Sequence, residues 1–141
     1  MTHDRILIAT DNSEPAQRAT AEAITLAESF DATLSALYVL ETAEPPPWFE
    51  DPATEPGLDT NAGQALNEVV SEAGDRGLEP EVVTAVVRGQ TGPAILEYAD
   101  EHDIDLIVLG THGRTGFDRL LIGSVAEHVV RKSPVPVVTV R

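Results

Sequence analysis

Residues 110–130, GTHGRTGFDRLLIGSVAEHVV, combine glycines and a serine in a spacing that suits phosphate binding. The first three glycines lie three residues apart and have no Cβ, so their backbone can approach a ligand closely and their amide groups can converge on phosphate oxygens. Gly123 and Ser124 precede an apolar helical pattern, and the first amides of a helix form a partly positive anion site. The structural alternative is that the glycines form a tight turn and Ser124 caps the helix.

Charged side chains within this stretch offer further contacts. Arg114 and Arg119 could pair with phosphate oxygens in a bidentate way, or they could balance nearby acidic residues. His112 could contact a phosphate or bond to the backbone of its own loop. The other three histidines have no metal-ligand spacing, so we expect no transition-metal site.

The chain is strongly acidic, but its charge is unevenly distributed. It has 24 acidic and 9 basic residues, and a formal net charge of −15. Residues 110–141 hold five of the bases and only two of the acids, so an anionic ligand is best tolerated there. Nucleic acid is not an expected partner, because a protein that binds it needs a basic face. The acid excess is typical of adaptation to high salt or of an ordinary acidic protein.

Apolar runs and helical spacing alternate along the chain. Strands are predicted at residues 5–9, 33–40, 81–87, 105–110 and 135–140. Helices are predicted at residues 16–29, 63–76, 93–102 and 125–131. This order predicts a parallel sheet with helices on both faces, within one domain spanning residues 1–141.

Helix boundaries carry their own signals. Ser13 and Thr91 mark the starts of the first and third helices. Ser124, followed three residues later by Glu127, matches a capping box for the last helix. Gly77 is expected to end the second helix.

These elements predict where a ligand would bind. Ligands of open parallel sheets lie beyond the carboxyl ends of the strands, where successive connections leave in opposite directions. With the first and fourth strands as neighbours, the loop ATDNSEP at residues 9–15 and the glycine stretch open onto one crevice. In the Pro-rich stretch 41–60, Trp48 and Phe49 could close over a ligand or simply pin the stretch to its own domain.

The combined pattern resembles that of the universal stress protein family. Gly110-x2-Gly113-x9-Gly123-Ser124 is similar to the family's glycine signature, which its ATP-binding branch carries whole. RILIATDNSEPAQRA resembles the family's opening strand, acidic loop and first helix, and SPVPVVTVR resembles its closing strand. The resemblance implies an α/β three-layer sandwich, adenine nucleotide alpha hydrolase-like, with a five-stranded parallel sheet in the order 3-2-1-4-5. It also implies an ATP-binding regulatory module of the stress response.

The resemblance also implies a set of ATP-binding positions. Asp11 would lie near the ribose or the phosphates and could bind Mg²⁺ or Mn²⁺ through oxygen, and Val39 would contact adenine through its backbone. The implied set is Ala9, Thr10, Asp11, Val39, Gly110, His112, Gly113, Arg114, Gly123, Ser124 and Val125. Asn12 replaces a glycine that the family often has, and asparagine tolerates the left-handed backbone.

No residue pattern in the chain indicates efficient catalysis. The Walker and G-x-G-x-x-G motifs are absent, and no group dedicated to activating water is recognisable, so ATP hydrolysis is expected to be slow at most. Two alternatives to a nucleotide-binding regulator stay open: a nucleotide-free dimeric protein-interaction module, and a weak ATPase.

The last strand is expected at a sheet edge, where the resemblance implies a symmetric homodimer. Pro136 has no N–H to donate, so its nitrogen must face away from a partner strand. No apolar run approaches the roughly 18 residues of a membrane span. We therefore expect a soluble cytoplasmic protein.

Overall fold

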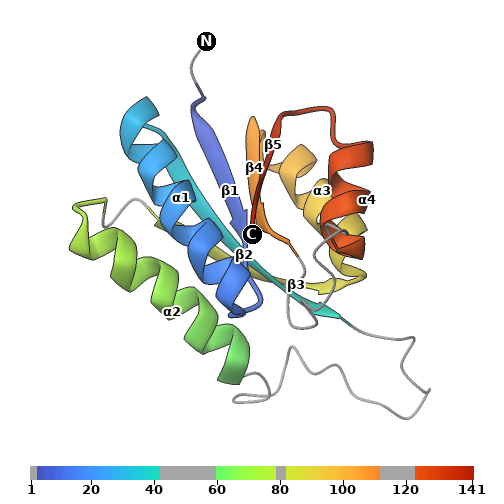
Figure 1. Cartoon of the computed structure of the whole chain (residues 1–141), viewed down its shortest axis with the longest axis horizontal. Coiled ribbons are helices and arrows are strands. Elements are labelled where there is room, and N and C mark those ends of the chain that lie inside the picture. Colours follow the sequence, from blue (N-terminus) through green and yellow to red (C-terminus); the bar gives the residue numbers. More distant parts are fainter. Residues whose placement is uncertain (1–2, 42–59, 79–81, 112–122) are drawn as a thin grey trace.

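A computed structural model of the chain describes residues 3–41, 60–78, 82–111 and 123–141. Strands and helices alternate through these ranges (Figure 1). The strands are β1 (Arg5–Ala9), β2 (Thr33–Glu41), β3 (Val82–Gly89), β4 (Leu106–Gly110) and β5 (Val137–Val140). The helices are α1 (Glu14–Phe30), α2 (Thr60–Asp75), α3 (Thr91–Glu101) and α4 (Ser124–Lys132).

The five strands form one parallel sheet, as the sequence predicts, in the order β3-β2-β1-β4-β5 that the family resemblance implies. Ile8 of β1 pairs with Ala36 of β2 on one side and with Val108 of β4 on the other. The first and fourth strands are therefore neighbours, and the chain leaves them in opposite directions at this point.

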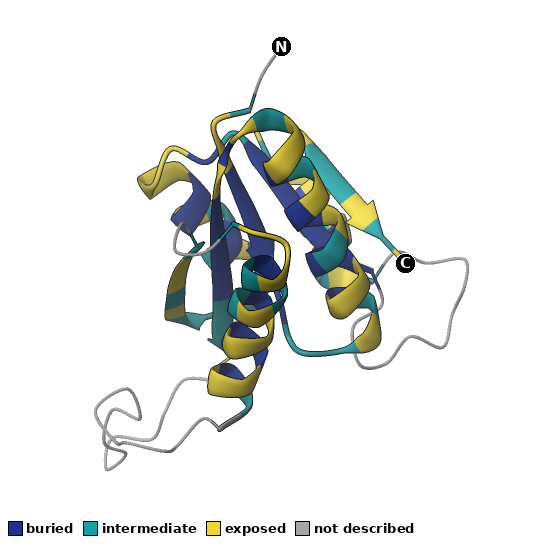
Figure 2. Cartoon of the chain, turned by 90° about the vertical axis from the view of Figure 1, so that its left-hand side faces the viewer, coloured by how far each residue is buried: buried dark blue, intermediate teal, exposed yellow. Residues whose placement is uncertain are grey.

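Helices cover both faces of the sheet. Figure 1 shows α1 and α2 on one face and α3 and α4 on the other. Ile6, Leu7 and Ile8 of β1 are consecutive and fully buried, because a central strand covered on both faces has no solvent side. Figure 2 shows the buried strands between helices whose outer faces are exposed. None of the helices in the described ranges has the length and apolar character needed to cross a bilayer.

Two of the predicted helix boundaries are confirmed. The Ser13 hydroxyl caps α1 by accepting a hydrogen bond from the Ala16 backbone N–H at 3.3 Å. Gly77, with a φ of +86°, follows the end of α2, and the next residue, Leu78, donates its N–H back to the Ala73 carbonyl.

The predicted capping box of α4 is wrong. The N-cap residue is Gly123, and Ser124 is the first residue of the helix. Gly123 has φ 82° and ψ 148°, a conformation that glycine alone adopts readily, so the cap falls on it rather than on the serine. Glu127 instead forms an ion pair with Arg131 one turn later. In α3 the N-cap is Gln90, and Thr91 is the first helical residue.

Candidate functional site

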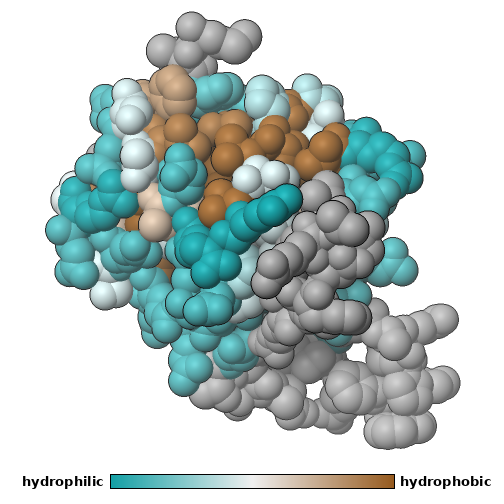
Figure 3. Space-filling view, in the orientation of Figure 1, coloured by the Kyte–Doolittle hydropathy of each residue, from teal (hydrophilic) through white to brown (hydrophobic). Residues whose placement is uncertain are grey.

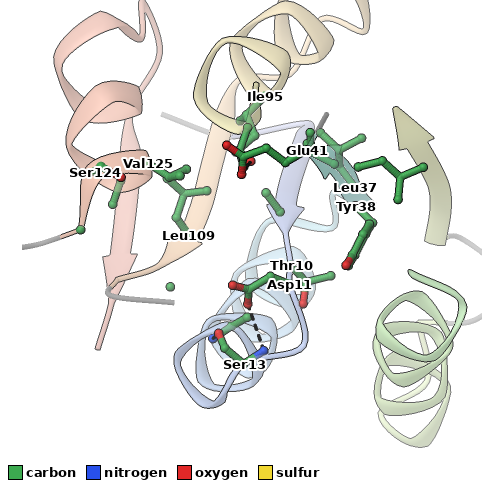
Figure 4. A pocket seen from close by; sticks show the side chains of 18 residues that line it. Thr10, Asp11, Ser13, Leu37, Tyr38, Glu41, Ile95, Leu109, Ser124 and Val125 are labelled. Carbon is green, nitrogen blue, oxygen red and sulfur yellow. Dashed lines mark hydrogen bonds between the residues drawn. The ribbon is translucent and has the colours of Figure 1, made fainter. Parts of the chain in front are cut away.

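A cavity of about 590 Å³ lies at the carboxyl ends of β1, β2 and β4. The amino ends of α3 and α4 complete it, and Figure 4 shows side chains from all these elements directed toward it. The lining residues are Ala9, Thr10, Asp11, Ser13, Ala16, Leu37, Tyr38, Val39, Leu40, Glu41, Thr91, Ile95, Leu109, Gly110, Gly123, Ser124, Val125 and Ala126. The cavity therefore has a largely apolar wall and polar groups at its ends.

Most of the sequence-predicted site residues meet at this cavity. Its lining includes Ala9, Thr10, Asp11, Val39, Gly110, Gly123, Ser124 and Val125. His112, Gly113 and Arg114 lie outside the described residues, as do Arg119, Trp48 and Phe49. Segments more than 100 residues apart in the sequence thus contribute to one site.

The turn after β1 orients one polar end of the cavity. Asp11 Oδ1 accepts a hydrogen bond from the Ser13 backbone N–H at 3.0 Å, which Figure 4 marks with a dashed line. Asn12 between them has a φ of +67°, so the left-handed turn expected at this position is present. Its N–H donates to Thr10 Oγ1 at 3.1 Å. These bonds hold the Asp11 carboxylate against the wall of the cavity.

The amino end of α4 forms the second polar end of the cavity, and its charge is partly positive where that of Asp11 is negative. Gly123 has no side chain to cap the helix, and the exposed Ser124 hydroxyl belongs to the first turn. The first amides of α4 lack intrahelical acceptors and carry partial positive charge. In α1, by contrast, Ser13 provides a cap and Glu14 adds a negative charge to the first turn. The start of α3 also has no side-chain cap, but the Glu41 carboxylate accepts a hydrogen bond from its first residue, Thr91. The first-turn acid of α4, Glu127, pairs with Arg131 and does not line the cavity. Of these three helix starts, α4 is therefore the best suited to an anion.

Gly110 is required for a different reason from the one that the sequence suggests. A Cβ at this position would lie 2.6 Å from the Pro15 carbonyl carbon and 2.7 Å from the Ala16 backbone nitrogen. Its φ is not among the positive values of the described glycines. The missing side chain lets the start of α1 pack onto the end of β4, so Gly110 shapes the cavity by close packing.

Glu41 and Thr91 are cavity residues that sequence reasoning missed. Thr91 Oγ1 donates a hydrogen bond to Glu41 Oε2 at 3.0 Å, which joins the end of β2 to the start of α3. The apolar run of β2 ends at Leu40, so Glu41 looked like the first residue of the Pro-rich stretch. Its pairing with Gly89 extends the strand by one residue. Had the alternation of side chains along the strand been followed one residue past the apolar run, it would have placed Glu41 on the same side as Val39.

The described residues of the cavity do not form a metal site by themselves. Among the described residues, no three histidine, aspartate or glutamate side chains cluster as a ligand set. Asp11 could contribute one carboxylate, so an ion bound there would depend on oxygens of a ligand or of water.

Comparisons with known proteins identify close relatives of this fold. The sequence model of the universal stress protein family matches residues 2–141. Universal stress protein MJ0531 of Methanocaldococcus jannaschii is 32% identical over 149 residues, covering 99% of this chain and 82% of its own length. Universal stress protein UspA from Lactobacillus plantarum has a TM-score of 0.82 at 30% identity, covering 100% of this chain and 99% of its own. A universal stress protein solved in complex with cAMP has a TM-score of 0.73 at 26% identity, with coverages of 100% and 98%.

These structural neighbours have the adenine nucleotide alpha hydrolase-like fold, which confirms the fold that the sequence resemblance implies. The likeness covers the whole sheet and both helical layers, because the matched fraction of each chain is nearly complete.

Proposed function

The chain belongs to the universal stress protein family, and from that membership we propose that it binds an adenine nucleotide, ATP first among them, as a regulatory module of the stress response. The observation that carries the proposal is the cavity of about 590 Å³ with an uncapped helix start at one end. Its volume lies in the range of small-molecule sites. A relative of the same fold has been solved with cAMP, itself an adenine nucleotide.

The phosphates would bind at the amino end of α4. Backbone amides at Ser124 and Val125 would donate to phosphate oxygens, and the Ser124 hydroxyl would add a further donor. The stretch that follows Gly110 would add further contacts to the phosphates, through His112, Gly113 and Arg114. The partial positive charge of the helix start supports this orientation, because the two carboxylates among the described lining residues, Asp11 and Glu41, lie on other elements.

The nucleoside would lie along the apolar wall. The Val39 backbone would contact adenine, with Ala9, Ile95 and Leu109 providing apolar surface for the ring. Asp11, on the turn after β1, would accept hydrogen bonds from ribose hydroxyls. When Mg²⁺ or Mn²⁺ accompanies the phosphates, the same carboxylate can supply one oxygen ligand to the ion.

Equilibrium dialysis with labelled ATP tests the proposal. The wild-type protein should retain ATP, and Ala9→Phe should lose it, because a ring at position 9 occupies the apolar wall without removing a polar contact. Thermal unfolding of the variant checks that its fold is intact. A wild-type protein that retains no adenine nucleotide would favour the alternative of a nucleotide-free interaction module. Phosphate release measured in parallel would reveal a weak ATPase.

We further propose that two copies pair through β5 as a homodimer. Among the described strands, β5 lies at the edge of the sheet and pairs with β4, and Figure 3 shows apolar surface gathered over this edge. The Pro136 carbonyl accepts from the Ile107 N–H of β4. Since N–H and C=O of an extended residue point to the same side, the Pro136 nitrogen also faces β4, as dimerisation through the open edge requires.

A cytoplasmic location belongs to the proposal of nucleotide binding, because adenine nucleotides are plentiful there.

A further inference from the structure

We propose that Glu41 selects the base of the nucleotide by accepting a hydrogen bond from the 6-amino group of adenine. The inference rests on the proposed nucleotide site. It goes further because it assigns the preference for a 6-amino over a 6-oxo purine to one carboxylate of this chain.

The position of Glu41 on β2 directs it into the cavity. Alternate residues of a strand face the same side, so Glu41 shares its side with Leu37 and Val39. Both of those residues pack in the core between the sheet and helices α3 and α4. Glu41 lies beyond that core, at the end of the strand, and Figure 4 shows it on the same wall as Ile95.

One hydrogen bond orients the Glu41 carboxylate, which belongs to an exposed residue at the rim of the cavity. Thr91 Oγ1 donates to Oε2 at 3.0 Å, and Thr91 begins α3, whose first amides favour a nearby negative charge. This bond uses one of about four acceptor positions on the carboxylate. The group is therefore oriented by its neighbour and still has acceptor capacity for a ligand.

The sheet order indicates which part of a nucleotide reaches Glu41. β4 leads toward the amino end of α4, β1 carries Asp11, and β2 ends at Glu41. Neighbouring strands lie about 4.8 Å apart, so the ends of β4 and β2 are separated by roughly 10 Å. In a nucleotide, the phosphate, the sugar and the base follow one another in the same order as β4, β1 and β2 in the sheet. With phosphate at α4 and sugar at β1, the base arrives at β2.

The chemistry of the carboxylate then decides between bases. An ionised carboxylate only accepts hydrogen bonds, so it pairs with the donor 6-amino group of adenine and opposes the 6-oxo group of hypoxanthine. It also repels phosphate, which reinforces the orientation of the ligand. The competing explanation is that Glu41 only fastens β2 to α3.

Binding of ATP, ITP and 2′-deoxy-ATP to the wild type, Glu41→Gln and Glu97→Gln tests the inference. The glutamine can still accept from Thr91, and its amide can donate to a 6-oxo group. We expect the preference of the wild type for ATP over ITP to narrow about tenfold in Glu41→Gln, as for the loss of one hydrogen bond to a charged group. Glu97→Gln removes the same charge from an exposed position of α3 outside the cavity and should keep the wild-type ratio.

The outcomes separate this inference from the proposed function. If the wild type binds no ATP, the nucleotide site itself is wrong. If ATP binds and Glu41→Gln leaves the ATP to ITP ratio unchanged, Glu41 only fastens β2 to α3 and the inference is overturned. It is also overturned if the substitution abolishes discrimination against 2′-deoxy-ATP and leaves the purine ratio intact, because Glu41 then contacts the ribose.

Discussion

At the scale of single residues, the hydrogen atom that serves as the side chain of Gly110 lets β4 approach α1. We expect Gly110→Ala to lower the free energy of unfolding by about 3 kcal/mol, the upper end for overpacking, because its Cβ would meet the backbone of Pro15 and Ala16. Urea denaturation measures this loss.

Gly63→Ala is the matched control for that prediction. Gly63 is exposed on α2, and a Cβ there would have no neighbour within 4 Å. Alanine is the better helix former, so this variant should gain about 0.5–1 kcal/mol. Equal effects of the two substitutions would contradict the close packing of α1 on β4.

Tyr98 gives the fold a dependence on alkaline pH. Its side chain is buried, and the loss of hydration raises the pKa of its phenol above 10.0, against a smaller opposite effect of its hydrogen bond with Ser35. The unfolded chain therefore loses the phenolic proton first. This contribution to stability is complete below about pH 10 and is lost as the pH rises through the folded-state pKa.

Comparing the wild type with Tyr98→Phe isolates that contribution. Phenylalanine cannot ionise, so the wild type should lose stability relative to the variant as the pH is raised from 9 to 11. Denaturant midpoints at each pH provide the measurement. A stability difference that stays constant over this range would mean that the phenol has no raised pKa.

At the scale of elements, Arg76 fastens α2 to α1. Its guanidinium pairs with Glu28 at 2.5 Å, donates to Thr25 Oγ1 at 2.9 Å and donates to the Ala21 carbonyl at 3.2 Å. Arg76→Lys should cost about 1 kcal/mol despite keeping the charge, because one ammonium cannot reproduce the planar fork of donors.

Arg131→Lys provides the comparison for Arg76. The ion pair of Arg131 with Glu127 is exposed and lies within α4. The substitution Arg131→Lys should therefore change the free energy of unfolding by at most about 0.5 kcal/mol. Thermal unfolding of both variants tests the contrast. Similar small effects would show that Arg76 contributes charge alone.

The limits of sequence reasoning also appear at the element scale. The strand bounds are predicted to within two residues, because the apolar runs are bounded by polar residues. The helices begin up to three residues earlier than their apolar periodicity indicates, since first turns are polar. Glu41 was missed for a related reason, because its strand continues past the apolar run. The need for glycine at position 110 was visible, but its contact with α1 depends on tertiary packing.

At the scale of the whole molecule, the proposed dimer depends on the open edge of β5. The Pro136 carbonyl accepts from Ile107 of β4 and the Val140 carbonyl accepts from Thr111, just after β4. By alternation, the N–H of Thr139 therefore faces the open side. Thr139→Pro should therefore leave the β4 ladder intact and convert a dimer to a monomer. Sedimentation measures the mass, and a dimer that survives the substitution would place the interface elsewhere.

The most direct test of the account is calorimetric binding of ATP and adenosine to the wild type and Ser124→Asp. Aspartate in the first turn of α4 favours the helix but repels phosphate, so ATP affinity should fall at least about a hundredfold while adenosine affinity and thermal stability hold. Ser71→Asp adds the same charge at an exposed position of α2 and should bind ATP as the wild type does. Undiminished ATP binding by Ser124→Asp would contradict a phosphate site at the start of α4.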